Sequence, residues 1–405
     1  MKKSTHITPV LLLFAFILSL LPKQPAAAGP SAVDETINRY RQYEQGIYDR
    51  YTAEASSIEQ TYRRYRRIIK EEYKAYEREI LKRWPSAETS TAKKWVEYSQ
   101  DYRLRRIVDF KNGYIRLDLQ VKKGEDIDTL ADQELRDMVL ESPQTAFKRN
   151  RLLQNIERRI TNDIPGAITG NPDKSPVLLQ MVTGRQKPTN SEIDAALAIM
   201  KQRATVSRNR AKAPGTEIVS MRFPLPSDSL KRKAMEYRPV VKNYANQRGL
   251  SEALVLAVIH TESAFNPLAR SRVPAYGLMQ IVPGSAGMDA SKLLFGRPVL
   301  LSPSYLYGKT NNINVGTAYL YLLYYRYLGK IKNPTSRLYC AIAAYNTGPG
   351  NVARAFTGST NINQAAKTIN LMSPDEVYQH LLARLPTRET RDYLKKVTGR
   401  IAIYQ

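Results

Sequence analysis

The segment Val255–Pro267 reads VLAVIHTESAFNP and places one carboxylate, Glu262, inside an apolar run. Leu254, Val258 and Glu262 are four residues apart, so a helix would bring them onto one face. Burial on that face disfavours the charged carboxylate and raises its pKa, which is what a general acid needs near neutral pH. The Asn-Pro pair that closes the segment predicts the end of the helix. A helix-capping or surface role for Glu262 is the structural alternative.

Residues 1–28 have the layout of a secretory signal peptide. Two lysines precede the apolar run Val10–Leu21, and the small residues Ala26–Ala28 follow it. This order predicts cleavage before Gly29, and the apolar run is too short for a comfortable membrane span. We therefore expect an exported chain, with an uncleaved N-terminal anchor as the alternative.

The chain contains a single cysteine, Cys340, far from the cleavage region. A lipid-modified N-terminal cysteine is therefore not expected, and a secreted chain with one cysteine forms no internal disulfide. Stability must come from core packing, for which 405 residues and two domains are ample.

The net charge of +25 predicts polyanionic surroundings. Nucleic acid is the usual partner of so basic a chain, but export argues against it, and no nucleic-acid partner is expected. Anionic lipid headgroups, or a cell-wall polymer that carries carboxylates, fit better. A basic surface that is simply solvated is the alternative.

Residues 29–225 predict an α+β accessory domain that begins with one long helix at 33–83. In this helix isoleucine and tyrosine recur at spacings near three and four on a charged rod. The stripe comprises Ile37, Tyr40, Ile47, Tyr51, Ile58, Tyr62, Tyr65, Ile69, Tyr76 and Ile80. Packing against its own domain is favoured over a coiled-coil seam or a membrane-surface face, because tyrosine suits a coiled-coil seam poorly.

The clearest β signal is the pair Arg103–Phe110 and Ile115–Val121, which flanks a turn containing Asn112-Gly113. Asn-Gly between β-prone runs predicts a hairpin, and alternation in the second arm predicts one buried face. The rest of the domain reads as helix at 127–162, loops at 163–190, helix near 191–203 and strand at 218–225. It shows no catalytic constellation, which favours an accessory or docking role.

Residues 226–405 predict an all-helical domain with short polar breaks. Ser251 and Ser373 have the character of helix N-caps, and Ser373 opens a capping box. Gly316 lies inside a Tyr/Leu-rich helical pattern, which predicts the close approach of another element. Residues 286–301 read as a loop.

Five short motifs of this half occur in a fixed order. They are Glu262-Ser263, Tyr276–Gln280, Asn312–Leu320, Ala344–Asn346 and Glu389–Tyr393. Together they resemble the catalytic domain of the lytic transglycosylases that share the goose-type lysozyme fold. The segment Ile107–Gly113 is similar to the accessory domain of a membrane-bound branch of that family. The expected fold is therefore an α+β N-terminal domain, with a long helix and a β-hairpin or sheet, followed by an all-α, lysozyme-like catalytic domain.

The resemblance implies a peptidoglycan lytic transglycosylase. Such an enzyme cleaves the β-1,4 bond between N-acetylmuramic acid (MurNAc) and N-acetylglucosamine (GlcNAc) in glycan strands. The muramyl 6-hydroxyl attacks C1 and leaves a 1,6-anhydromuramic acid end, with no water consumed. Ordinary glycosidases need two carboxylates, whereas one acid/base, Glu262, suffices when the substrate supplies its own nucleophile.

The resemblance also implies a set of substrate-binding residues. They are Ser263, Gly277, Met279, Gln280, Tyr345, Asn346 and Glu389. Ser263 would steady the Glu262 carboxylate or the acetamido group of the substrate. Met279 and Gln280 would line the saccharide groove, and Gly277 would let the backbone come close to the sugar.

Tyr345 and Asn346 would lie opposite Glu262, where the Tyr345 hydroxyl would hydrogen-bond the carboxylate or stabilise the oxocarbenium ion. Glu389 would contact substrate polar groups or hold the last helix, and Tyr393 would pack beneath it. No metal or cofactor is expected, because the three histidines are scattered and no glycine loop has the right context.

The chain departs from the family pattern in two respects. The family member with this N-terminal domain is lipid-anchored at the outer membrane, whereas this chain lacks the cysteine, so a basic surface on an anionic membrane or an uncleaved signal would replace the anchor in the periplasm. Asp289 is the second departure, because an aspartate near Glu262 would allow attack by water. A hydrolytic muramidase and a non-catalytic wall-binding scaffold are therefore the alternative functions.

Overall fold

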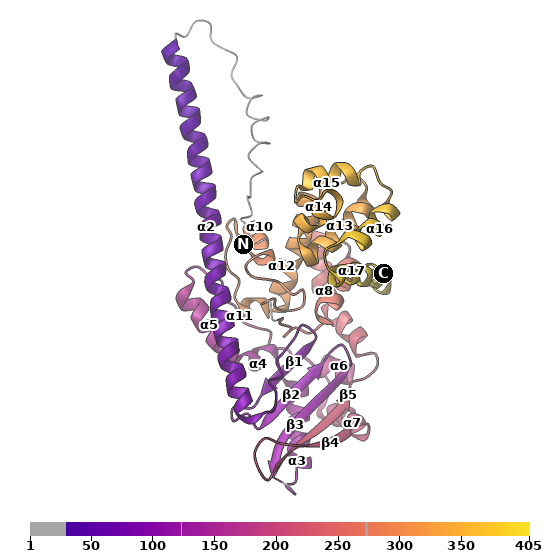
Figure 1. Ribbon diagram of the computed structural model, residues 1–405. Helices are drawn as coiled ribbons and strands as arrows, with labels where there is room; N and C mark the ends of the chain where they lie inside the picture. The colour runs from indigo at the N-terminus through magenta and orange to yellow at the C-terminus, as the bar shows by residue number, and fades with distance from the viewer. Residues whose placement is uncertain (1–29, 123, 272–273) are drawn as a thin grey trace. The chain divides into compact units, whose positions relative to one another are not determined.

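The computed structural model describes residues 30–122, 124–271 and 274–405, with side chains from Ser56 onward and that of Gln45 (Figure 1). The signal peptide predicted for residues 1–28 lies outside this range. The chain divides into two compact units, residues 1–59 and 60–405, and the second unit contains the sheet and every predicted site residue. Among the described helices, none combines the length and apolar character needed to span a membrane.

The long helix predicted for residues 33–83 is confirmed as α2, Pro30–Arg83. In its C-terminal half the stripe is buried: Tyr65 and Ile80 are fully enclosed, and the Tyr65 hydroxyl lies 3.1 Å from that of Tyr276. This burial favours the packing interpretation for residues 60–83. For the part before Ser56 the three interpretations stay predictions, because those side chains are not described.

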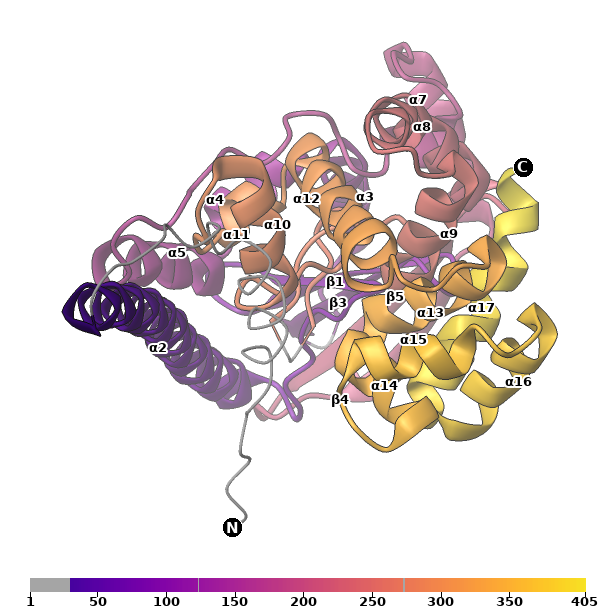
Figure 2. The same ribbon diagram turned by 90° about the horizontal axis from the view of Figure 1, so that it is seen from above.

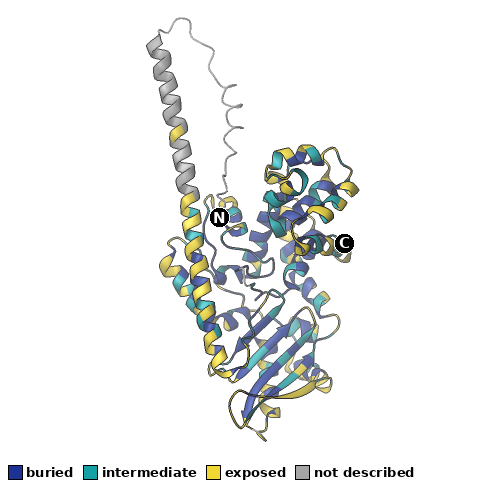
Figure 3. Cartoon of the chain, viewed as in Figure 1, coloured by how far each residue is buried: buried dark blue, intermediate teal, exposed yellow. Residues whose placement is uncertain are grey.

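The predicted hairpin belongs to a five-stranded antiparallel sheet of order β1-β2-β3-β5-β4 (Figure 1). The strands are β1 Lys94–Tyr98, β2 Leu104–Asp109, β3 Tyr114–Lys122, β4 Thr205–Arg210 and β5 Thr216–Pro224. The turn between β2 and β3 closes with Gly113, whose φ of 67° lies in the left-handed region that glycine adopts readily. Strands β1 and β4 were not predicted. All six residues of β4 are exposed at the sheet edge (Figure 3).

The expectation that only one face of β3 is buried is wrong. Asp118 is fully buried and Gln120 nearly so, although both alternate with apolar residues. The Arg105 guanidinium donates to the Asp118 carboxylate at 2.7 Å, and Arg116 lies 3.1 Å from the same oxygen. A buried carboxylate is tolerated when it is paired, so a polar network covers the second face of the sheet.

Helices flank the sheet in the α+β region, which we define as residues 60–224. They are α3 Asp128–Leu140, α4 Pro143–Arg149, α5 Arg151–Asp163, α6 Leu179–Thr183 and α7 Asn190–Gln202. The helical predictions for residues 127–162 and 191–203 are confirmed. The short α6 lies within the segment predicted as loops.

The helical region, residues 229–405, contains no strand of the described sheet, which confirms the predicted α+β and all-α fold class. Its elements are α8 Ser229–Gln247, α9 Glu252–Ser263, α10 Ala286–Phe295, α11 Pro303–Leu306, α12 Lys309–Tyr321, the π-helical turn η2 Leu322–Tyr327, α13 Pro334–Thr347, α14 Pro349–Thr357, α15 Ile362–Ile369, α16 Pro374–Arg384 and α17 Arg388–Tyr404. The predicted caps at Ser251 and Ser373 are both present. The loop predicted for residues 286–301 is wrong over its first part, because α10 occupies it.

The α+β and helical regions pack as one unit. Ile168 pairs with Leu301 in an isolated β-bridge, and the Ser302 hydroxyl donates to the Glu157 carboxylate at 2.7 Å. The domain boundary predicted between residues 225 and 226 stays a prediction.

Candidate active site

Glu262 lies in the last turn of α9, a helix whose other residues are almost all buried. The Ser251 side chain accepts from the Leu254 N–H and starts this helix. The helix ends at Ser263, slightly before the predicted Asn-Pro pair, because Ala264 and Phe265 adopt left-handed backbone angles with φ of 50° and 62°. Such angles cost about 1 kcal/mol or more per residue. The sharp turn of the backbone directly after the Glu262 helix is therefore energetically unfavourable in itself.

The environment of Glu262 favours its protonated form. Burial raises the pKa of Glu262 to about 7, and the charge of the exposed Glu389 acts in the same direction. The Tyr393 hydroxyl and the Lys93 ammonium oppose this rise, since both favour the carboxylate. A carboxyl with this pKa is populated in both protonation states near neutral pH, as a group that both gives and takes a proton must be.

Tyr393, on α17, is the tyrosine that faces Glu262. Its hydroxyl is buried and has no partner at ordinary hydrogen-bond distance among the described residues, yet it lies close enough to lower the pKa of Glu262. The sequence suggested that Tyr345 would reach the carboxylate, whereas the Tyr345 hydroxyl donates to the Met279 carbonyl at 2.8 Å. Burial raises the pKa of the Tyr345 phenol, and the nearby Glu262 charge raises it further. Tyr393 is buried, as expected of a residue that packs beneath the site, and it also acts on the Glu262 carboxyl.

The segment Tyr276–Gln280 is held from behind by Asn312. The Asn312 side chain donates to the Tyr276 carbonyl at 2.9 Å and to the Leu306 carbonyl at 2.8 Å, and accepts from the Met279 N–H at 2.8 Å. Asn312 is buried, so its amide is fully committed to this segment. The sequence placed Asn312 in a motif but gave it no role.

Gly277 and Met279 face the protein interior rather than an open groove. Gly277 has φ of +74°, and a Cβ there would lie 2.2 Å from the Asn312 amide nitrogen. Met279 is fully buried, and its sulfur would lie 2.2 Å from a Cβ at Gly316. The close approach predicted at Gly316 is thus to Met279. Gln280, also left-handed with φ of 48°, is partly exposed and donates to the Gly277 carbonyl at 3.1 Å.

The remaining predicted residues divide between support and the site. Ser263 is fully buried and its hydroxyl donates to the Ile259 carbonyl at 3.1 Å. The side-chain amide oxygen of Asn346 accepts from the Thr390 hydroxyl at 2.8 Å, which ties α13 to α17. Glu389 is exposed and near enough to act on Glu262. The substrate-binding roles expected of these residues stay predictions.

Asp289 lies on α10, where its carboxylate accepts from the Tyr327 hydroxyl at 3.1 Å. Its charge acts on Tyr319 and Tyr327 and is not among the charges that shift the pKa of Glu262. Glu389 is therefore the second carboxylate near Glu262 in the described part of the chain.

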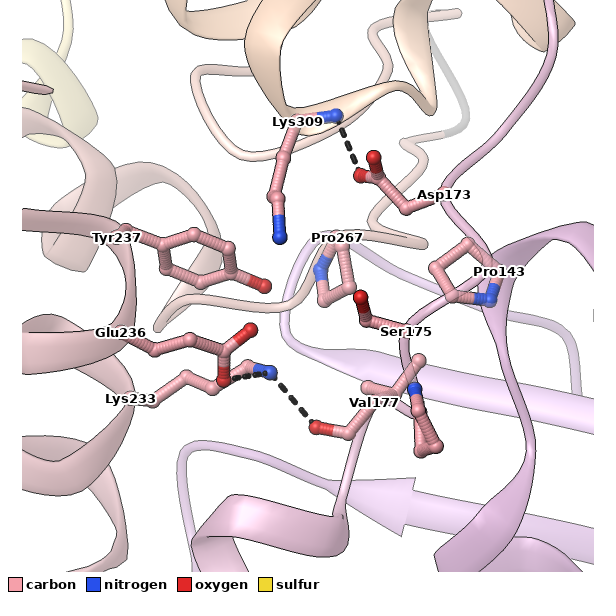
Figure 4. Close-up of a pocket in the computed structure, with 10 residues that line it drawn as sticks. Pro143, Asp173, Ser175, Val177, Lys233, Glu236, Tyr237, Pro267 and Lys309 are labelled. Carbon is pink, nitrogen blue, oxygen red and sulfur yellow. Dashed lines mark hydrogen bonds and ion pairs between the residues drawn. The ribbon is translucent and has the colours of Figure 1, made fainter. Parts of the chain in front are cut away.

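A separate polar pocket lies at the joint between the two regions (Figure 4). The Lys233 ammonium pairs with Glu236 at 2.7 Å and donates to the Val177 carbonyl at 2.8 Å, and Asp173 accepts from the Lys309 backbone N–H at 2.6 Å. None of the predicted site residues lines this pocket. Lys233 and Glu236 pair with each other, and the Asp173 carboxylate accepts from a backbone N–H, as expected of a structural joint.

The Transglycosylase SLT domain family matches residues 239–368, which contain four of the five motifs. Membrane-bound lytic murein transglycosylase C of Serratia proteamaculans is 34% identical over 315 residues, covering 75% of this chain and 80% of that protein. The Sodalis glossinidius protein of the same name is 45% identical over 185 residues, covering 45% of this chain and 50% of that protein.

Among solved structures, the 70 kDa soluble lytic transglycosylase of Escherichia coli is 29% identical. It covers 44% of this chain and 25% of its own, with a TM-score of 0.33. The Serratia relative carries the assignment, because the match extends over both the α+β and the helical regions. The chain belongs to the family of membrane-bound lytic murein transglycosylase C, a family of peptidoglycan lytic transglycosylases.

Proposed function

We propose that Glu262 is the single acid/base with which this chain cleaves the β-1,4 bond between MurNAc and GlcNAc. The protonated carboxyl donates its proton to the glycosidic oxygen as the bond to C1 breaks. The resulting carboxylate then takes the proton of the muramyl 6-hydroxyl as O6 bonds to C1. The product carries a 1,6-anhydromuramic acid end, and the proton returns to Glu262 without water being consumed.

The carrying observation is the raised pKa of Glu262 in the last turn of α9. A carboxyl with the ordinary pKa of 4.5 would be almost fully ionised at neutral pH and could not act as the acid. Hydrolysis needs a second carboxylate to activate water. The Asp289 carboxylate accepts from Tyr327, and the Glu389 carboxylate is exposed to solvent. Neither is therefore buried beside Glu262 as the base of a carboxylate pair.

The other residues of the site have supporting roles in this proposal. Tyr393 orients the Glu262 carboxyl and donates to it when it is charged. Tyr345 and Asn312 hold the Met279 backbone from two sides, so the partly exposed Gln280 is presented to the saccharide. Asn346 and Glu389 lie on the α13–α17 side of the site and contact polar groups of the sugar.

Mass spectrometry of the soluble products released from peptidoglycan sacculi tests this function. We expect muropeptides that end in 1,6-anhydromuramic acid, and none from Glu262→Gln. Glu389→Gln is the matched variant: it should still release anhydro products. Products one water heavier, lost in Glu389→Gln, would show a muramidase that uses Glu389 as its second carboxylate. Binding to sacculi without any release would support the wall-binding scaffold.

We propose that the chain works in the cell envelope, as the names of its membrane-bound relatives suggest. Residues 1–28 would direct export to the periplasm, and the excess of basic residues would hold the chain on an anionic membrane surface, including that of the outer membrane. Co-sedimentation with vesicles of anionic lipid tests the second step. Binding should weaken as salt is raised, and equal binding to neutral vesicles would contradict it.

A further inference from the structure

A turn of the α+β region docks next to the catalytic helix. The turn Thr91–Lys94 leads into β1 and is closed by the Thr91 N–H donating to the Lys94 carbonyl at 2.8 Å. The Asn266 side chain donates to the Ala92 carbonyl at 3.3 Å, and the Arg270 N–H donates to the Thr91 carbonyl at 3.5 Å. Asn266 follows Glu262 by one helical turn in sequence, so the docking places this turn beside the site.

Lys93, in the middle of this turn, is partly buried, and its ammonium makes no hydrogen bond or ion pair with any described residue. Its backbone is fixed, because its carbonyl accepts from the Phe110 N–H at 3.0 Å. Burial and the Arg400 charge lower the pKa of Lys93, whereas Glu262 acts in the opposite direction. An ammonium that is partly desolvated, placed near another cation and left unpaired gains free energy when an anion binds.

Helix α17 contributes two more cations. Tyr393, Lys396 and Arg400 are spaced i, i+3 and i+7, so they lie on one side of α17. Helices α17 and α9 pack together (Figure 2). The Arg400 guanidinium donates to the Thr261 hydroxyl at 2.8 Å, directly beside Glu262. Lys396 is exposed and acts on Lys93.

The positive field at this place is not neutralised by the protein. His260, two residues before Glu262 on α9, has its pKa lowered to about 4, by burial first and then by the Arg400 and Lys93 charges. Glu262 does not cancel this field when it is protonated to act as the acid. Neither Lys93 nor Arg400 has a carboxylate partner within ion-pair distance among the described residues.

We propose that Lys93, Lys396 and Arg400 form an anion-binding wall beside Glu262 that takes the carboxylates of the peptide stem on the muramyl sugar. The stem hangs from C3 of the sugar whose C1 is attacked, so its carboxylates arrive near the acid. Ammonium and guanidinium groups bind carboxylates through charge-assisted hydrogen bonds. The inference deepens the proposed function and rests on it: the α+β region supplies part of the substrate-binding surface.

Two synthetic tetrasaccharides of alternating GlcNAc and MurNAc test the wall. They carry the same stem tetrapeptide, with its carboxyl groups either free or converted to carboxamides. We expect the wild-type chain to have about tenfold higher kcat/KM for the free acids, a typical effect of hydrogen bonds to charged groups. Lys93→Met should remove most of this preference and Lys93→Arg should keep it. Assays at pH 5.5 hold Glu262 protonated.

Lys94→Met is the matched control, because Lys94 lies on the same turn but is already paired with Glu88 at 3.0 Å. It should keep the preference for free acids. If Lys93→Met does not fold, Lys396→Met, at an exposed position, should reduce the same preference. Equal kcat/KM for both substrates in the wild type, or an unchanged preference in a folded Lys93→Met, would overturn the wall. Failure to form anhydro products from either substrate would overturn the proposed function instead.

Discussion

Replacing Glu262 by glutamine should make the folded chain more stable at alkaline pH. The folded-state pKa of this carboxyl is about 7, above its ordinary value of 4.5. The folded chain therefore binds more protons than the unfolded chain between these two values, so the stability contributed by Glu262 falls as pH rises through that window. Glutamine has a similar shape and does not titrate, so it avoids the cost of burying a charge.

The size of the effect follows from the two pKa values. At 1.36 kcal/mol for each pH unit, the difference between about 7 and 4.5 amounts to about 3 kcal/mol. This figure is an upper value, because the Glu262 side chain retains a small contact with solvent. Glu262→Gln should match the wild type in its free energy of unfolding near pH 4, and exceed it by up to about 3 kcal/mol above pH 7.

Urea unfolding followed by circular dichroism between pH 4 and pH 9 measures this difference. Glu376→Gln is the control of opposite sign. The Ser373 capping box lowers the pKa of Glu376, so the stability it contributes is present above the unfolded pKa, and its loss should appear there. A stability difference for Glu262→Gln that is independent of pH, or a variant weaker than the wild type at pH 9, would refute the assigned environment.

Three further substitutions test the surroundings of the site. Tyr393→Phe removes a group that lowers the pKa of Glu262, so the alkaline limb of the pH profile of kcat/KM should move to higher pH. An unmoved limb would exclude the contact. Gly277→Ala should lower the free energy of unfolding, measured by heat or urea, by about 3 kcal/mol, since its Cβ would lie 2.2 Å from the Asn312 amide nitrogen. Gly358→Ala, with φ of +72° and open space, should lower it by about 1 kcal/mol. Equal losses in the two variants would contradict the packing at Gly277. Asn312→Ala breaks three buried hydrogen bonds and should lower the free energy of unfolding by about 3 kcal/mol. Asn311→Ala breaks one hydrogen bond and should lower it by less than about 1 kcal/mol. Similar losses in the two variants would contradict the role of Asn312 in holding the segment Tyr276–Gln280.

Local sequence signals predicted the elements that local chemistry dictates. The helix of Glu262 has an apolar run and a serine cap, and the β2–β3 hairpin has its Asn-Gly turn, so neither depends on distant partners. Strand β4 has no such signal: its six residues are exposed, and it is a strand because it pairs with β5 along its whole length. The polar face of β3 was misread for a similar reason, since Asp118 is buried by arginines from two strands.

The sequence predicts the central residue of the candidate site, Glu262, but not the side chains that surround it in the structure. The order of the motifs and the position of a lone acid on an apolar helix face predict Glu262 as the acid/base, and the structure places it in a buried environment. The choice between Tyr345 and Tyr393 as its neighbour depends on how α13 and α17 pack against α9, which no spacing within either helix encodes. Lys93 comes from the other region of the chain, and nothing in its own sequence context distinguishes it from the other basic residues there.

The proton affinity of Glu262 reflects a balance between the two regions. A group that first donates and then accepts a proton within one turnover works best when its pKa lies near the ambient pH. Burial within the helical region alone would push the pKa of Glu262 further upward, which would make the carboxyl a weaker acid for the donating step and its carboxylate a stronger base for the accepting one. Tyr393 on α17 and Lys93 from the α+β region both lower the pKa of Glu262, which leaves it at about 7. Under the proposed mechanism the α+β region therefore contributes to catalysis, because the Lys93 charge makes Glu262 a stronger acid for the step in which it protonates the glycosidic oxygen.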